Sequence, residues 1–373
     1  KEIKTLVNKN IKIEYGRVLG KDITIHDLFV DKYDAVFLAF GAHESMRLDL
    51  KHEDVDGIYP SIQFLKAFNM RGEELARGHV GVIGGGNSAV DAARVALRQK
   101  DVASVSLFYR RTREEMPAYE EEVEAALEEG VRIETLISPV KILVRQEEIE
   151  AAVREGVELE TLVSPIKIHS RKGHLVDIEC IRNQLGDVDA TGRHKPVPIP
   201  GSEFKVKLDT LIVAIGEKPK SEFLAGLGLE IDKSGRIKVN PKTLATNLRG
   251  VFAGGDLVTG PNTVIDAIAA GKKAAESIDL YLQKKPLIKP ARPKLPDVYI
   301  APAPGDESES ITRVRAVNPA LTPAERVKNF REVEMSLPEN SAREESRRCL
   351  RCDLAFTEEK SAAMPVQAAM EGA

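Results

Sequence analysis

The sequence predicts an α/β protein built on parallel sheets, and three observations support this fold class. Asp34–Gly41 and Leu208–Gly216 each combine a short polar lead, an unbroken apolar strand and a closing glycine. Unbroken apolar strands are typical of parallel sheets that are covered on both faces. Between Val80 and Tyr109, a β-branched strand, a glycine-rich turn, a helical run and a second strand form one βαβ unit. Residues 247–282 predict a further strand, a Gly-Gly-Asp turn and a helix.

The remaining elements are shorter or less regular. We expect strands at Ile11–Tyr15, Ile23–Ile25 and His174–Arg182, helices at Ile58–Met70 and Leu321–Arg351, and a polar loop at Asn183–Gly201. After Lys285 the composition becomes rich in proline, which predicts an extended linker in front of a separate C-terminal tail.

A tandem repeat occupies residues 121–168. Its two copies, residues 121–142 and 147–168, are identical at 15 of 22 positions. Each copy predicts an acidic helix that stops at a glycine, followed by a strand and a Ser-Pro pair. Because about three copies are needed to bury the core of a solenoid, we interpret the repeat as a duplication carried as an insertion. A functional role for the extra copy is the alternative.

Composition excludes several classes of function. Lys and Arg number 54 and Asp and Glu 58, so the formal net charge is −4, which argues against nucleic acid as a partner. The longest apolar stretches, such as Ala35–Phe40, are far shorter than the roughly 18 residues of a membrane span. Three cysteines exclude a disulfide scaffold and are typical of a reducing, cytoplasmic location.

The glycine-rich turn has the spacing of a dinucleotide-binding loop. Residues 84–89 read GGGNSA and fit G-x-G-x-x-A, after an apolar strand and at the start of a helix. Gly84 permits the tight turn, and Gly86 lets the backbone approach a pyrophosphate. The N–H groups of the following helix, at Asn87 and Ser88, would then bind the phosphates. The alternative is a turn that binds no ligand.

The end of the next strand carries the residues that distinguish the two nicotinamide cofactors. An acidic residue there binds the ribose hydroxyls of NADH, whereas an arginine receives the 2′-phosphate of NADPH. Arg110, Arg111 and Arg113 follow this strand, and the first acid is Glu114. The pattern favours NADPH over NADH. The alternative is a solvated basic turn that pairs with the acidic helix Glu120–Glu129.

A second nucleotide site is predicted near residue 256. The strand of residues 250–256, GVFAGGD, delivers Asp256 just after Gly255, and a helix begins near Thr263 and Val264. An aspartate in this position can bind a ribityl hydroxyl of a flavin, and the helix N-terminus can face the electron-rich edge of the flavin ring. Taken alone, the turn could be any junction between a strand and a helix.

Together, the motifs AFGA, GGGNSA, YRRTREEMPA, VAIGEKP, GVFAGGD and GPNTVIDAIAAGKKAA, in this order, resemble the FAD/NADPH-binding module of the glutamate synthase small subunit family. Dihydropyrimidine dehydrogenase and the large subunit of ferredoxin:NADP transhydrogenase share this module. The resemblance covers roughly residues 1–283. It implies two Rossmann-like dinucleotide-binding domains, with the NAD(P) domain inserted in the FAD domain, and hydride transfer from NAD(P)H to FAD.

The resemblance also implies site residues and domain boundaries. The flavin-binding positions of the family correspond here to Gly255, Asp256 and Thr263. Its pyridine-nucleotide-binding positions correspond to Gly84, Gly86, Ser88, Arg110 and Arg111. We add Asn87, Val264 and the strand-end glycines Gly41 and Gly216 as cofactor-binding candidates. The predicted parts are residues 1–70 and 211–285 for the FAD domain, 71–210 for the NAD(P) domain, 286–305 for the linker and 306–373 for a mostly helical tail. The cofactors carry the chemistry, so we predict no catalytic acid or base.

Two features depart from this family. Its members begin with a βαβ unit whose G-x-G-x-x-G binds the FAD pyrophosphate, and this sequence has no such motif. Because the flavin motif is otherwise intact, we interpret the sequence as a piece of a longer polypeptide. Impaired FAD binding is the alternative. The second departure is the doubled unit of residues 121–168, which the family pattern contains once.

The tail carries a pair of cysteines. Residues 347–353, RRCLRCD, resemble the start of the cysteine runs that bind iron–sulfur clusters in the same family. A cluster needs about four thiolates, and besides Cys349 and Cys352 the sequence has only Cys180, which we expect in a buried strand. We therefore expect a cluster shared with a partner, a degenerate remnant or a lone thiol pair. Because residues 321–351 carry only a thin apolar stripe, we predict that residues 306–356 dock on that partner.

These observations predict a cytoplasmic, FAD-dependent NAD(P)H oxidoreductase. It would act as the electron-input subunit of a complex and pass electrons through FAD to the iron–sulfur centres of a partner, either a glutamate synthase or an oxidoreductase with a metal cofactor. The alternative is a flavin-free, nucleotide-binding structural subunit that docks partners. The sequence leaves open the final electron acceptor and the direction of electron flow.

Overall fold

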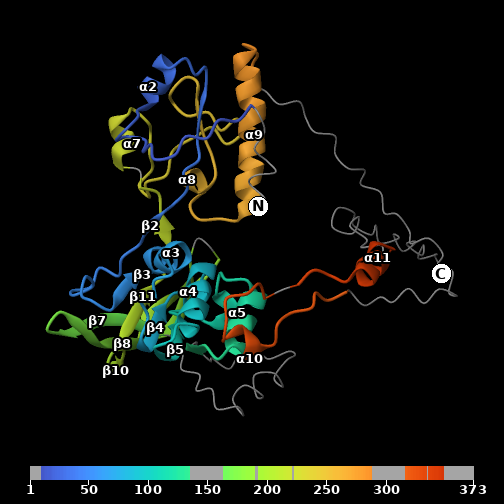
Figure 1. Cartoon of the computed structure of the whole chain (residues 1–373). Helices are drawn as coiled ribbons and strands as arrows, with labels where there is room; N and C mark the ends of the chain where they lie inside the picture. The colour runs from blue at the N-terminus through green and yellow to red at the C-terminus, as the bar shows by residue number, and fades with distance from the viewer. Residues whose placement is uncertain are drawn as a thin grey trace, which may run out of the picture. The chain divides into compact units, whose positions relative to one another are not determined.

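The described part of the chain contains both helices and strands (Figure 1). The computed structural model describes residues 10–134, 163–189, 192–220, 222–287, 316–333 and 335–347. The chain divides into one unit of residues 1–287 with 323–330 and another of residues 288–322 with 331–373. No helix in these described ranges is long and apolar enough to cross a membrane.

The strands are β1 (Val36–Leu38), β2 (Glu44–Ser45), β3 (Ile58–Pro60), β4 (Gly78–Ile83), β5 (Val102–Phe108), β6 (Arg132–Glu134), β7 (Val163–Arg171), β8 (His174–Val188), β9 (His194–Pro198), β10 (Phe204–Lys207), β11 (Thr210–Val213), β12 (Glu217–Lys218) and β13 (Val251–Ala253). The helices are α2 (Ile25–Val30), α3 (Ser61–Arg71), α4 (Asn87–Leu97), α5 (Glu120–Glu128), α7 (Glu222–Gly226), α8 (Asp256–Thr259), α9 (Val264–Leu282), α10 (Pro323–Arg326) and α11 (Glu339–Arg347), with a 3₁₀ turn η1 (Arg113–Glu115).

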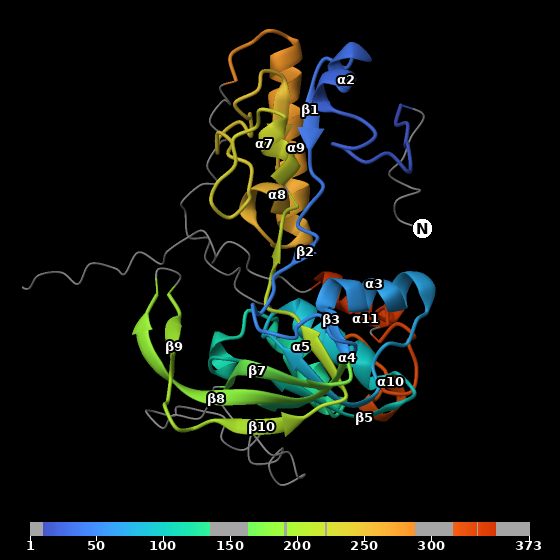
Figure 2. The same ribbon diagram turned by 90° about the vertical axis from the view of Figure 1, so that its left-hand side faces the viewer.

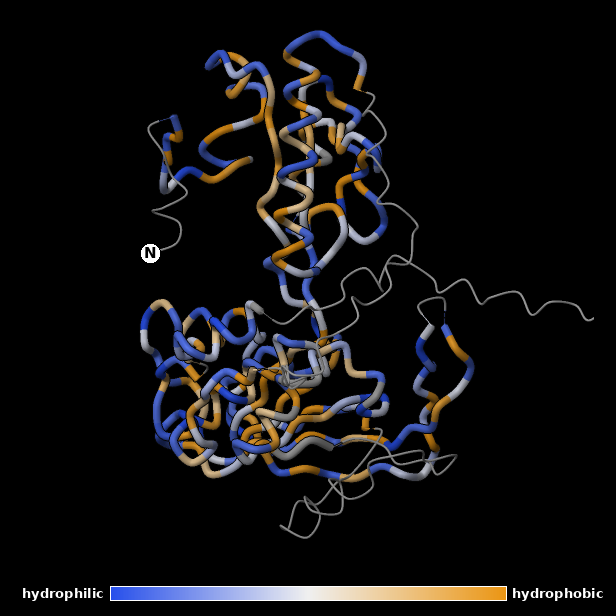
Figure 3. Tube along the Cα trace, turned by 90° about the vertical axis from the view of Figure 1, so that its right-hand side faces the viewer, coloured by the Kyte–Doolittle hydropathy of each residue, from blue (hydrophilic) through white to orange (hydrophobic). Residues whose placement is uncertain are grey.

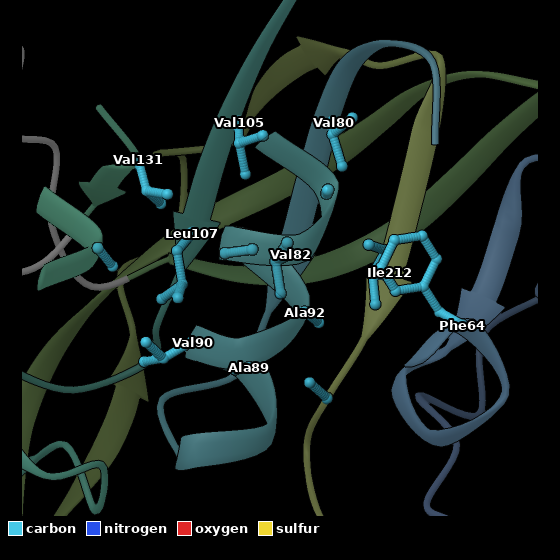
Figure 4. Packing of buried hydrophobic residues seen from close by; sticks show 14 of the residues in the cluster. Phe64, Val80, Val82, Ala89, Val90, Ala92, Val105, Leu107, Val131 and Ile212 are labelled. Carbon is cyan, nitrogen blue, oxygen red and sulfur yellow. The ribbon is translucent and has the colours of Figure 1, made fainter. Parts of the chain in front are cut away.

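A parallel sheet in the order β3-β11-β4-β5-β6 forms the centre of what we call the five-stranded lobe. Val82 of β4 pairs with Leu107 of β5 on one side and with Ile212 of β11 on the other. All three side chains are buried beneath α3 and α4 (Figure 4). Helix α4 buries the small residues Ala89, Ala92, Ala93 and Ala96, which lets its backbone lie close to the sheet.

The other face of this sheet is covered by an antiparallel sheet, β10-β8-β7, with β9 paired to β8 (Figure 2). Phe108 and Leu211 pack there against Ile178 and Cys180 of β8. The prediction of a polar loop at Asn183–Gly201 is wrong, because β8 continues to Val188 and pairs with the antiparallel strand β9 at His194–Pro198. The polar residues lie on a hairpin whose side chains are largely exposed, so apolar patterning is weak there.

A second region, the two-stranded lobe, contains β1, β13, α2 and α7–α9. Strands β1 and β13 form a parallel pair although the five-stranded lobe lies between them in sequence. The five-stranded lobe is thus an insertion, and the predicted α/β architecture is confirmed. The two segments that join the lobes pair with each other as β2 and β12.

Helix α9 in the two-stranded lobe is largely uncovered. Hydrophobic residues occur along its length (Figure 3), but its buried side chains are only Ala274 and Ser277. Val264, Ile265 and Ile268 are 75%, 73% and 51% exposed. This apolar face is unusual because helices of globular proteins normally bury such a face against another element.

The N-terminal strand predictions are wrong. Residues 11–15 form no strand, and Ile23 makes a single bridge with Leu19. Helix α2 begins at Ile25 because Thr24 and Asp27 form a capping box: the Asp27 N–H donates to the Thr24 hydroxyl at 3.2 Å, and the Thr24 N–H donates to the Asp27 carboxylate at 2.8 Å. Local hydrogen bonding at this cap overrides the β propensity of isoleucine.

The expected helix at Leu321–Arg351 is reduced to α10 and α11. The Leu321 N–H, just before α10, donates to the carbonyl of Val333, which follows α10, at 2.9 Å, so the chain turns back on itself. Pro338 directly precedes α11. Residues 323–330 pack on the chain's own helices: the Phe330 ring lies 4.3 Å from that of Phe68. This part of the tail therefore has an intramolecular contact where we expected docking on a partner.

The tandem repeat is described only in part. Helix α5 and β6 belong to the first copy, and β7 begins within the second. Residues 135–162 lie outside the described ranges. The expectation that one copy is an insertion therefore stays a prediction.

Candidate nucleotide-binding sites

The glycine-rich turn joins β4 to α4 in the five-stranded lobe. Gly84 has φ +146°, and a Cβ atom there would lie 2.1 Å from the carbonyl oxygen of Ala214. Only glycine fits this close approach of two backbones. At Gly86, by contrast, a Cβ would meet nothing nearer than Pro117 at 3.8 Å. Space is therefore left beside the Gly86 backbone.

The start of α4 is free of side-chain capping among the described residues. Gly86 is the N-cap, and its carbonyl accepts the N–H groups of Ala89 and Val90 at 2.9 and 3.2 Å. The N–H groups of the first helical turn, at Asn87 and Ser88, have no intrahelical partner and favour an anion. The Asn87 side chain serves a different purpose, because its oxygen accepts the Tyr119 N–H at 2.9 Å and fixes the start of α5.

The two arginines after β5 have different surroundings. Arg110 is exposed. Arg111 is only 5% exposed: its Nε donates to the His194 carbonyl at 2.6 Å and its guanidinium pairs with Asp189 at 3.0 Å. Sequence reasoning treated the two as equivalent and missed Asp189 and His194. The Gly192 turn between alternating residues was the signal for the hairpin that brings them here.

Five of the predicted flavin-site residues line one hollow in the two-stranded lobe. Its volume is 170 Å³, and it is lined by Phe37, Ala39, Gly41, Gly255, Asp256, Asn262, Thr263, Val264 and Ala267. The strand ends of β1 and β13 supply Gly41 and Gly255, and the first turn of α9 supplies the opposite wall. Sequence segments more than two hundred positions apart therefore meet here, as the parallel pairing of β1 with β13 requires.

Local hydrogen bonds hold the polar groups of this hollow. The Asp256 carboxylate accepts the Asn262 N–H at 3.2 Å, and the Asn262 side chain accepts the Thr263 N–H at 2.9 Å. Thr263 caps α9: its hydroxyl accepts the Asp266 N–H at 3.1 Å. Within the described part of the chain the Asp256 carboxylate makes one hydrogen bond, through one oxygen, so it has further acceptor capacity for a hydroxyl group.

Glu217 lies where the two lobes join. The Met46 N–H donates to the carbonyl of the predicted site residue Gly216 at 2.8 Å, which continues the β2–β12 pair. Burial raises the pKa of the Glu217 carboxyl, the charge of Asp256 raises it further, and a hydrogen bond with Ser88 lowers it. Its Oε1 is buried without a hydrogen-bond partner in the described part of the chain. The Glu217 carboxyl thus interacts with one residue of each predicted site: Ser88 by a hydrogen bond and Asp256 through its charge. Sequence reasoning did not single out Glu217.

The cysteines provide no described metal site. Cys180 is a buried free thiol in β8, and burial raises its pKa to about 12. Cys349 and Cys352 lie outside the described residues. Within the described ranges no group of His, Cys, Asp and Glu side chains could hold a metal ion. Metal binding by the two tail cysteines therefore stays a prediction.

Comparison with known proteins decides the family. The sequence profile of the pyridine nucleotide-disulphide oxidoreductases matches residues 1–271. The chain belongs to this family. Within the pyridine nucleotide-disulphide oxidoreductases, it is similar to the glutamate synthase [NADPH] small chain of Escherichia coli, with 33% identity over 73% of this chain and 55% of that protein. The resemblance found in the sequence is confirmed.

Two other relatives match nearly the whole chain. The NADP(+)-dependent formate dehydrogenase subunit beta of Moorella thermoacetica is 37% identical over 94% of this chain and 46% of its own length. The NADPH-Fe(3+) oxidoreductase subunit beta of Geobacter sulfurreducens is 35% identical over 94% of this chain and 53% of its own length. The chain thus spans about half the length of the curated relatives it matches.

The fold is also that of solved structures. FprA of Mycobacterium tuberculosis, solved in complex with NADPH, superposes with a TM-score of 0.56 at 20% identity, over 72% of this chain and 67% of FprA. At this identity the likeness concerns the fold alone. It supports an architecture of two Rossmann-like domains, which correspond to the five-stranded lobe and the two-stranded lobe.

Proposed function

We propose that this protein is an FAD-dependent NAD(P)H oxidoreductase that serves as the electron-input subunit of a larger complex. The observation that carries the proposal is the pair of nucleotide cradles in one chain of this family. One is the open backbone at Gly86 below the start of α4, and the other is the hollow around Asp256. Glu217, in contact with Ser88 and influenced by Asp256, lies at the junction that a hydride would cross.

The five-stranded lobe would bind the nicotinamide nucleotide. The N–H groups at Asn87 and Ser88 would bind the pyrophosphate, because the start of a helix is a ready anion site. The exposed guanidinium of Arg110 would pair with a 2′-phosphate, which NADPH carries and NADH lacks. NADPH is therefore the favoured substrate, in agreement with the names of the relatives.

The two-stranded lobe would bind FAD. Asp256 would accept a hydrogen bond from a ribityl hydroxyl, and the N-terminus of α9 at Thr263–Val264 would face the electron-rich edge of the ring. Gly41 and Gly255 keep side chains out of the hollow. FAD, when bound, accepts a hydride and releases electrons singly. The chain's own residues bind and orient the two cofactors, and no catalytic acid or base is required.

The proposed partners are iron–sulfur or metal-cofactor oxidoreductase subunits in the cytoplasm. This follows from relatives named as subunits of formate dehydrogenase, of an Fe(3+) oxidoreductase and of glutamate synthase. Cys349 and Cys352 would contribute to a cluster shared with such a partner. Neither nucleic acid nor a membrane is part of the proposal.

The proposal is tested by flavin content and turnover of the protein with NADPH and an artificial dye. Asp256→Ala should weaken FAD binding about 10- to 100-fold, the equivalent of a charge-assisted hydrogen bond of roughly 1.5–3 kcal/mol. Asp279→Ala, which removes an exposed acid further along α9, is the matched control and should bind FAD normally. Unchanged FAD affinity of Asp256→Ala would refute the assignment of the site. A wild-type protein that takes up no FAD would favour the flavin-free structural subunit.

A further inference from the structure

One stretch of the C-terminal tail, residues 323–330, belongs to the same unit as the five-stranded lobe, whereas the tail on either side of it belongs to the second unit. Two hydrogen bonds close this stretch at its base. The Leu321 N–H donates to the Val333 carbonyl at 2.9 Å. The Met335 N–H donates to the Pro319 carbonyl at 2.7 Å. Residues 323–330, which we call the anchor loop, therefore leave the tail and return to it at nearly the same point.

Two side chains of the anchor loop contact the lobe. The Phe330 ring lies 4.3 Å from the Phe68 ring of α3, with an angle of 36° between the ring planes. The Arg326 guanidinium pairs with the Glu128 carboxylate of α5 at 3.1 Å, and the Arg326 side chain is only 12% exposed. Paired aromatic rings stabilise a contact beyond the effect of their buried area. The loop thus combines an apolar contact with an ion pair, on two different helices.

The anchor loop also completes the hydrogen bonding of a buried guanidinium on a third helix. The Arg98 side chain, at the end of α4, is 7% exposed, and its Nη2 pairs with Glu129 at 2.6 Å. Its Nη1 donates to the Arg94 carbonyl at 2.7 Å. Its Nε donates to the Arg326 carbonyl of the loop at 2.9 Å. A buried donor that loses its acceptor is costly, so this surface is fully bonded when the loop occupies it.

This contact is well separated from the predicted pyrophosphate site. That site lies at the first turn of α4, near Ser88, whereas Arg98 is the C-cap of the same helix. Ten residues of α-helix span about 15 Å. The loop therefore bonds α4 at the end opposite to the one that would face the nucleotide phosphates.

We propose that the anchor loop is an intramolecular docking segment that binds the surface formed by Phe68, Arg98 and Glu128 and so ties the C-terminal tail to the five-stranded lobe. The occupant of this surface is the chain's own tail and not a partner subunit. Because the loop acts at the far end of α4, it holds the tail without taking part in nucleotide binding. The inference goes beyond the proposed function and does not depend on it, since it rests on contacts within the chain.

Limited trypsin digestion of the whole chain tests the anchor, because trypsin cleaves after Arg326 and Lys328 inside the loop. Cleavage there follows the fraction of molecules in which the loop is released. Phe68→Ala leaves the sequence of the loop intact and should speed cleavage about tenfold, since the ring pair is lost. Met70→Ala, on the same helix and 72% exposed, is the matched control and should be cleaved like the wild type. Unchanged cleavage of Phe68→Ala overturns the inference.

Phe330→Ala removes the other ring and decides the matter if Phe68→Ala fails to fold. It should speed cleavage to a similar extent, and Val317→Ala, an 84% exposed tail residue, is its control. The double variant should be cleaved little faster than either single variant, because all three lack the same contact. Effects that multiply in the double variant overturn the contact. Wild-type protection that falls on dilution would assign the loop to a second copy and overturn the intramolecular anchor.

NADPH binding, measured by calorimetry, tests the separation of the anchor from the nucleotide site. Phe68→Ala and Phe330→Ala should bind NADPH within about twofold of the wild type, as for substitutions away from a site. A loss of about tenfold in both variants would contradict the separation. A wild-type protein that binds no NADPH would contradict the proposed function alone, because the digestion decides the anchor without the nucleotide.

Discussion

The two lobes of this protein differ in how completely they cover their sheets. In the five-stranded lobe, Leu107 and Ile212 face the helices while Phe108 and Leu211 face the antiparallel sheet, and all four are buried. In the two-stranded lobe, β1 and β13 pair only with each other among the described strands. There, α9 leaves Val264, Ile265 and Ile268 largely exposed.

This difference indicates how each lobe would bind its nucleotide. The glycine turn of the five-stranded lobe is fixed between buried strands and a buried helix, so its geometry is set before any ligand arrives. The hollow around Asp256 has one wall on an exposed helix. Helices of globular proteins normally bury such an apolar face, so this wall of the hollow is less completely packed than the glycine turn.

The largest contrast is expected in stability. Leu107→Ala should lower the free energy of unfolding by about 2–5 kcal/mol, because it empties space in a fully buried core. Ile265→Ala, on the exposed face of α9, should change it by no more than about 0.5 kcal/mol. Denaturant unfolding of both variants measures the difference. Equal losses would show that the α9 face is as buried as the core.

Gly84→Ala is expected to have the next largest effect. The added Cβ would lie 2.1 Å from the Ala214 carbonyl, at a φ that side chains avoid, so the turn must shift at a cost of roughly 1–3 kcal/mol. NADPH binding should weaken because the pyrophosphate cradle moves with the turn. Gly226→Ala in α7, where a Cβ meets nothing within 4 Å, is the control. Normal NADPH affinity in Gly84→Ala would contradict the assigned role of the turn.

Sequence patterning predicted the buried parallel strands, the glycine turn and the Asp256 turn, because apolar runs and glycine spacing are local signals. It could not predict that Arg111 would be buried, since that depends on Asp189 and His194, which lie about eighty positions away and meet it only in the folded chain. The strand at Ile23–Ile25 was mispredicted because the Thr24–Asp27 cap overrode the propensity of the isoleucines. The exposed face of α9 is a property of tertiary packing and leaves no mark on the helix's own sequence.

A smaller effect concerns the carboxyl at the junction of the lobes. Because the pKa of Glu217 is raised in the folded protein, the folded state holds its proton more tightly, and stability falls as the pH rises through that pKa. Glu217→Gln should therefore stabilise the protein by about 1 kcal/mol at neutral pH, where a partly buried carboxylate with one unsatisfied oxygen is costly. The gain should vanish in acid, where both residues are neutral. Thermal unfolding across pH measures it, and a gain that persists in acid would refute the explanation.

The central claim is that the two lobes act together, with NADPH in one reducing FAD in the other. Anaerobic titration of the FAD-loaded protein with NADPH, followed by the visible absorption of the flavin, tests this most directly. The account predicts that the flavin band bleaches as NADPH is added, with NADH much less effective. A protein that binds FAD and NADPH but whose flavin stays oxidised would contradict it.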